Sequence, residues 1–145
     1  MPYLAVTDRD TKVLHEWLNE LCEHLGWERD INSKNRALAA LRAVLQQLRN
    51  NLPIEASAHL SAQLPIIVRG FYFENWHPAS VPLKERKKDQ FLLSVKESLI
   101  NRSHTEIDEE LATKAVFQTL NSRIPGEEVE KLKKILPHHI KELWI

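Results

Sequence analysis

Two stretches of this 145-residue chain match each other and decide the fold. The first, at 43–69, reads AVLQQLRNNLPIEASAHLSAQLPIIVR, and the second, at 115–141, reads AVFQTLNSRIPGEEVEKLKKILPHHIK. A shift of 72 residues aligns them without a gap and gives nine identities in 27 positions, including two prolines. Each stretch predicts the end of a long helix, a helix that begins at the first proline, and a short helix after the second.

The rest of the chain also has a helical pattern, because apolar residues recur at spacings of three and four. It predicts helices over about 10–25, 33–50, 66–70, 91–99 and 105–120, the last with capping-box-like spacing of Thr105 and Asp108. In the proline-started segment at 125–136, Ile135 is expected inside the apolar face. The stretch FYFENWHPASVP at 71–82 has no helical period, so we expect it to connect two halves.

The expected fold class is all-α, a bundle of about six to eight helices built from two similar halves. Since a unit of about 70 residues closes a core with difficulty, the halves are expected to pack into one domain over 1–145. The predicted boundaries are about 8–73 for the first half, 74–84 for the connection and 85–145 for the second half.

Composition narrows the possible functions. The chain has 20 basic and 20 acidic residues and a net charge of zero, which disfavours nucleic-acid binding. It contains only three glycines and no glycine-rich phosphate loop, so no cofactor is expected. No apolar run is long enough to span a membrane, and the N-terminus has no signal-peptide pattern. We therefore expect a cytoplasmic protein that does not enter membranes.

A family resemblance is carried by several runs that together span nearly the whole chain. The most specific are 40–45, the Ala62-Gln63-Leu64-Pro65 run, Arg69-Gly70 followed by Tyr72, Trp76, and Leu136-Pro137 with Leu143-Trp144. With these residues the chain resembles the bacterial domain-of-unknown-function family 2267. The resemblance implies an all-helical fold, and it carries over no catalytic residue. Glu74-Asn75 stands before Trp76 where that pattern would have a glycine.

No catalytic or metal-binding constellation is evident in the sequence. His15-Glu16 begins like a metalloprotease motif, but Asn19 stands where the second histidine would be. His138 and His139 are adjacent, diverge on a helix, and are interpreted as surface residues near a helix end. Cys22, the single cysteine, lies on an apolar helix face, where a thiol behaves as a small hydrophobic group. We therefore expect a protein that is not an enzyme.

Two clusters are candidate binding sites. The first is a groove between the halves, lined by aromatic residues, with Arg69, Tyr72 and Trp76 as anchors; packing of these aromatics into the seam between the halves is the alternative. The second is the basic turn KERKK at 84–88, with Lys84, Arg86, Lys87 and Lys88 facing an acidic partner or a phosphate, or simply solvent.

The leading hypothesis is a helical module that binds a protein partner or a second copy of itself. The alternative is a regulatory protein that binds a small molecule or an anion at the aromatic seam between the halves.

Overall fold

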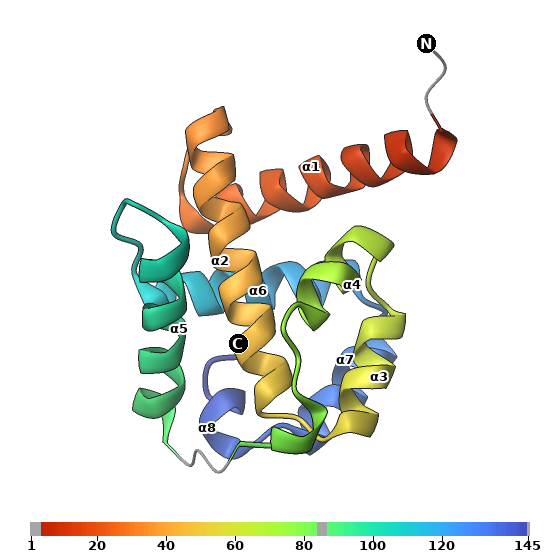
Figure 1. The fold of residues 1–145 in the computed structure, drawn as a ribbon, viewed down its shortest axis with the longest axis vertical. Coiled ribbons are helices and arrows are strands. Elements are labelled where there is room, and N and C mark those ends of the chain that lie inside the picture. Colours follow the sequence, from red (N-terminus) through yellow and green to blue (C-terminus); the bar gives the residue numbers. More distant parts are fainter. Residues whose placement is uncertain (1–3, 84–86, 145) are drawn as a thin grey trace.

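The computed structural model describes residues 4–83 and 87–144, and this part of the chain is entirely helical apart from its connections (Figure 1). The elements are α1 (Ala5–Leu25), α2 (Ile31–Asn50), α3 (Ile54–Ala62), α4 (Ile66–Phe73), a 3-10 helix (Pro78–Ser80), α5 (Lys88–Arg102), α6 (Glu109–Arg123), α7 (Gly126–Ile135) and α8 (His138–Lys141). Eight α-helices over the described ranges confirm the predicted fold class.

The long helices begin and end at residues suited to those positions. Gly26 ends α1 with a φ of 73°, a conformation that favours glycine, and its N–H bonds to the Cys22 and Glu23 carbonyls. Asp30 caps α2 by accepting a hydrogen bond from the Ser33 N–H at 2.8 Å. The cap moves the start of α2 two residues before the predicted one.

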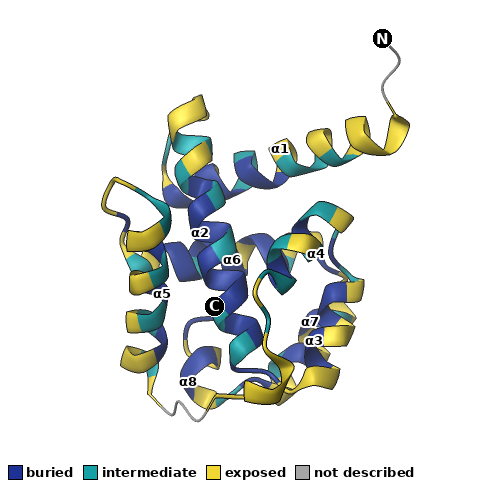
Figure 2. Ribbon diagram, viewed as in Figure 1, coloured by how far each residue is buried: buried dark blue, intermediate teal, exposed yellow. Residues whose placement is uncertain are grey.

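Helices α2 and α6 lie at the centre of the fold. Helix α2 packs against α1, α4, α5 and α6, and α6 also packs against α1 and α5. Both central helices are largely buried, whereas the first turns of α1 project from the body and are exposed (Figures 1 and 2). One cluster of buried apolar residues runs through the helices, from Trp17 on α1 to Trp144 near the end of the chain.

The four prolines of the matching stretches each directly precede a helix. Pro53 and Pro65 come before α3 and α4, and Pro125 and Pro137 come before α7 and α8. A proline at this position costs no helical hydrogen bond, because the first N–H groups of a helix have no partner within it. The internal repeat itself, and the boundaries of its two halves, stay predictions.

The prediction for the aromatic stretch was wrong at its start. The helix expected to stop near Gly70 continues to Phe73, so Phe71, Tyr72 and Phe73 belong to α4. Val68 and Tyr72 are both fully buried and stand four residues apart. This spacing places them on one helix face, and burying that face outweighs the weak helical propensity of Gly70.

Three smaller expectations were also wrong. Asp108, not Thr105, caps α6, since its side chain accepts the Leu111 N–H at 2.8 Å. Ile135 is 51% exposed instead of lying inside the apolar face of α7. His139, expected at the surface, is buried and 6% exposed.

Candidate functional site

A groove between α3 and α7 is the candidate binding site. Helix α3 packs against α7, and the groove between them has a volume of about 440 Å³. This lies within the range of about 300–1,000 Å³ typical of ligand sites. Its lining residues are Ala56, His59, Leu60, Ala62, Gln63, Ile124, Glu128, Val129, Lys131, Leu132 and Ile135.

The floor of the groove is apolar. Leu60 from α3 and Val129 and Leu132 from α7 are each no more than 6% exposed. Ala56 and Ala62 lie on the α3 side, where their single methyl groups leave the space between the two helices unfilled. The groove therefore offers a concave apolar surface that is accessible from solvent.

The rim of the groove is polar and carries both signs of charge. Lys131 Nζ lies 3.5 Å from Glu128 Oε1, one turn away on α7, and His59 and Gln63 stand on the α3 side. Ile135 adds a half-exposed apolar side chain at the end of α7. An apolar floor with a polar rim is the usual composition of a protein-binding or ligand-binding surface.

Arg69, a predicted binding residue, joins two helices of the fold. Its Nε donates to the Ser61 carbonyl at 2.9 Å, and its Nη2 donates to the Leu64 carbonyl at 3.0 Å. Ser61 lies in the last turn of α3, and Leu64 lies two residues beyond the end of that helix. Arg69 therefore holds α4 against the end of α3.

Replacing Arg69 with glutamine is expected to lower the free energy of unfolding by about 1–2 kcal/mol, because two carbonyls lose charged donors. The measurement is urea unfolding followed by circular dichroism. Arg29→Gln is the matched control, since Arg29 forms an exposed ion pair with Glu23 and its loss should cost less than about 1 kcal/mol. Equal losses in the two variants would contradict the capping role of Arg69.

Tyr72 and Trp76 pack into the structure in different ways. Tyr72 is 0% exposed, and its hydroxyl lies 2.9 Å from Ser57 Oγ. Burial raises the pKa of Tyr72 well above its usual range, although Ser57 and Arg49 act in the opposite direction. Trp76 is partly buried against the Phe73 ring, with the ring centroids 4.9 Å apart. Its indole Nε1 is buried and has no hydrogen-bond partner among the described residues.

The basic turn is described only at its end, because Lys84 and Arg86 lie outside the described residues. Lys87 precedes α5, and its backbone N–H donates to the Gln90 side chain at 3.2 Å. Lys88 Nζ lies 3.9 Å from Glu110 Oε1, at the start of α6. Within the described ranges, no hydrogen bond or ion pair joins Lys87 or Lys88 to Arg69, Tyr72 or Trp76, the predicted anchors of the groove between the halves.

A network of arginines lies beside the aromatic stretch, and the sequence analysis did not identify it. We call it the arginine seam, and it consists of Arg42, Gln46 and Arg49 on α2, Glu74 after α4, and Arg102 at the end of α5. The Arg42 guanidinium binds the Glu74 carboxylate through Nε at 2.9 Å and Nη2 at 2.8 Å. Gln46 donates to Glu74 Oε1 at 3.2 Å and accepts from Arg102 Nη2 at 2.6 Å.

Arg49 is the buried member of the arginine seam, with 4% exposure. Its Nη1 donates to the Tyr72 and Glu74 carbonyls, at the end of α4. Burial lowers the pKa of Arg49, and the charge of Arg102 acts in the same direction, whereas Tyr72 and Glu74 oppose the shift. The 42, 46 and 49 spacing, which places these residues on one face of α2, was the one signal in the sequence.

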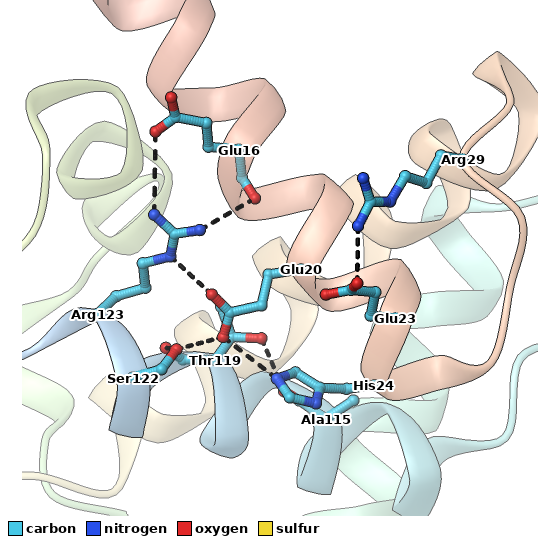
Figure 3. A network of polar contacts seen from close by, with 9 residues as sticks. All are labelled: Glu16, Glu20, Glu23, His24, Arg29, Ala115, Thr119, Ser122 and Arg123. Carbon is cyan, nitrogen blue, oxygen red and sulfur yellow. Dashed lines mark hydrogen bonds and ion pairs between the residues drawn. The ribbon is translucent and has the colours of Figure 1, made fainter.

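A second polar network joins Glu16 and Glu20 on α1 to Ser122 and Arg123 on α6 (Figure 3). Arg123 Nε donates to Glu20 Oε1 at 2.8 Å, and Ser122 Oγ donates to Glu20 Oε2. Burial alone would raise the pKa of Glu20, but hydrogen bonds from Ser122, His24 and Arg123 outweigh it and lower the pKa. Glu20 therefore stays ionised and serves as an anchor between the two helices.

The structure also places the cysteine thiol and the side chains that could bind a metal ion. Cys22 is fully buried, as predicted, and burial raises the pKa of its thiol. Over 4–83 and 87–144, no three His, Cys, Asp or Glu side chains come close enough together to hold a metal ion. No helix in these ranges has the length and apolar character needed to cross a membrane.

Comparison with known proteins gives one family. None of the curated proteins matches this chain. The family model described as "Uncharacterized conserved protein (DUF2267)" matches residues 14–143, from the middle of α1 to the end of the helical region. This match covers most of the chain and all of both matching stretches. The chain therefore belongs to the family of uncharacterized conserved proteins DUF2267.

Proposed function

We propose that the protein is a non-enzymatic interaction module whose α3/α7 groove binds apolar side chains from a second protein chain. The observation that carries the proposal is the groove itself, with a floor of Leu60, Val129 and Leu132 and a rim of mixed charge. A groove of this kind suits the apolar face of an amphipathic helix, whose anchors recur at spacings of three and four.

The exposed Ile135 supports the same proposal. This isoleucine is 51% exposed at the edge of an apolar groove, and a partner that covers it lowers the free energy by removing apolar surface from water. Glu128 and Lys131 at the rim would select a partner helix with complementary charges and keep it in register. A copy of the chain itself is the first partner to test, because exposed apolar residues lie at its projecting N-terminal end. These are Leu4 just before α1, at 72% exposure, and Val6 in the first turn of α1, at 49%.

Ile135→Glu is expected to weaken partner binding more than about tenfold. It should leave the free energy of unfolding within about 0.5 kcal/mol of the wild-type value. The variant places a charge on the groove without removing a buried group. Sedimentation velocity over a range of protein concentrations measures self-association of the wild type and the variant. For a different partner, affinity capture from native lysate makes the same comparison.

Leu93→Glu is the matched control for this test. Leu93 is 56% exposed on α5 and lies outside the α3/α7 groove, so the same charge should leave binding unchanged there. If Ile135→Glu and Leu93→Glu affect association equally, the groove is not the binding surface.

The alternative function, a regulatory protein that binds a small molecule, is supported by the groove volume of about 440 Å³. That volume accommodates a compact apolar molecule with a polar end at the rim. A thermal-shift screen against metabolites separates the two proposals. A saturable rise in Tm that Ile135→Glu removes would favour the small molecule, and a flat screen would favour the protein partner.

A further inference from the structure

The arginine seam carries more positive charge than its neighbours balance. The seam holds three guanidinium groups and one carboxylate. Arg42 binds the Glu74 carboxylate, whereas Arg49 donates to backbone carbonyls and Arg102 donates to the side-chain oxygen of Gln46. Among the described residues, neither Arg49 nor Arg102 has a carboxylate within 4.0 Å, whereas Arg42 has Glu74. Because guanidinium groups stay protonated in proteins, the seam retains an excess of two positive charges.

Solvent reaches the seam at Arg42 and Glu74. Their side chains are 30% and 34% exposed, so a dissolved anion can approach the ion pair. Below them, Arg49 is 4% exposed and already uses two backbone carbonyls as acceptors. Arg102 is partly buried, so Arg42 and Arg102 are the two guanidinium groups available to a ligand, and the buried Arg49 adds positive charge nearby.

The side chain of Gln46 separates the two available guanidinium groups. Its amide nitrogen donates to Glu74 Oε1 at 3.2 Å, and its oxygen accepts from Arg102 Nη2 at 2.6 Å. Arg102 thus donates to a neutral amide oxygen. A hydrogen bond to a charged acceptor would be about twice as strong. An anion placed between Arg42 and Arg102 would satisfy both guanidinium groups.

We propose that the arginine seam binds a phosphate group, with Arg42 and Arg102 as direct ligands and Glu74 as a built-in competitor. Phosphate fits the excess charge, because a phosphate monoester carries about −1.5 to −2 at pH 7, and its oxygens accept in pairs from guanidinium groups. Glu74 holds Arg42 in a bidentate pair in the unliganded protein, and the phosphate takes its place. The ligand class is a small phosphate ester or free phosphate.

The pKa shifts within the seam agree with this assignment. Burial lowers the pKa of Arg102, and the charge of Arg42 lowers it further, against the opposing effect of Glu74. The two arginines are therefore close enough to destabilise each other electrostatically, and an anion between them would relieve that repulsion. This surface is separate from the α3/α7 groove, so the two proposals fail independently.

The test is calorimetric titration of inorganic phosphate into the full-length protein, with ionic strength held constant by chloride. We expect saturable one-to-one binding that Arg102→Gln weakens about tenfold and Glu74→Gln strengthens about tenfold. Opposite effects of the two variants cannot arise from a general loss of folding. A sugar phosphate monoester titrated in parallel distinguishes a phosphate ester from free phosphate as the better ligand.

Arg29→Gln and Ile135→Glu are the controls, because both lie outside the arginine seam and should leave the phosphate affinity unchanged. Absence of saturable binding in both the wild type and Glu74→Gln would overturn the proposal. Phosphate affinity that is the same in Arg102→Gln, Glu74→Gln and Arg29→Gln would also overturn it, since it would indicate an adventitious ion only.

Discussion

Tyr72→Ala is expected to lower the free energy of unfolding by about 3–5 kcal/mol, the usual cost of removing a buried aromatic ring. The ring is fully buried on α4, and it packs edge-on against Phe73 with their centroids 5.1 Å apart. Its loss opens a cavity between α4 and the helices that α4 contacts, α1, α2 and α3. The measurement is urea unfolding at equilibrium, followed by circular dichroism.

Tyr72→Phe separates the ring from the hydroxyl in this experiment. It keeps the ring and removes only the partner of Ser57 Oγ, so the expected loss is about 1–2 kcal/mol. If Tyr72→Ala costs less than about 1 kcal/mol, the ring is not part of the core, and the prediction that Tyr72 anchors a binding groove gains support.

Phe117→Ala is expected to cost a similar amount, about 3–5 kcal/mol, at the other side of the core. Phe117 is 0% exposed on α6 and stacks on Trp144, with centroids 4.3 Å apart. Trp144 is also held by a hydrogen bond from its Nε1 to Asn121 Oδ1 at 2.7 Å. Removing the ring should therefore destabilise α6 and loosen the C-terminal segment together.

Leu111→Ala is the matched control on the same helix. Leu111 is 45% exposed, so its truncation should change the free energy of unfolding by no more than about 0.5 kcal/mol. Hydrogen exchange of the backbone amides at 138–144 gives a second reading, and we expect faster exchange there in Phe117→Ala. Unchanged stability and exchange would show that the stacked pair does not anchor the C-terminus.

The fold could be predicted from the sequence because its signals are local. Apolar spacing and four prolines before helices indicate where helices lie, and neither depends on tertiary contacts. The prediction for the aromatic stretch was wrong at its start because Gly70 and the nearby prolines suggested a loop. Val68 and Tyr72 lie four residues apart on one face, and their burial stabilises a helix there. That burial depends on contacts with the other helices.

The candidate site could not be predicted to the same extent, because it forms between segments far apart in the chain. The groove needs α3 and α7 to lie together, and the exposure of Ile135 depends on which face of α7 the core covers. Arg69 shows the same dependence on tertiary contacts. As an arginine next to aromatic residues it suggested a binding site, and nothing in the sequence indicated that its guanidinium donates to the Ser61 and Leu64 carbonyls.

The central proposal, a partner-binding groove between α3 and α7, is tested most directly by one comparison of association. Wild type, Ile135→Glu and Leu93→Glu are measured by sedimentation velocity for self-association and by parallel capture from native lysate. We expect a stoichiometric partner, a second copy or another chain, that binds the wild type and Leu93→Glu and is lost with Ile135→Glu. Binding that persists in Ile135→Glu, or no association of the wild type in either measurement, would contradict the proposal.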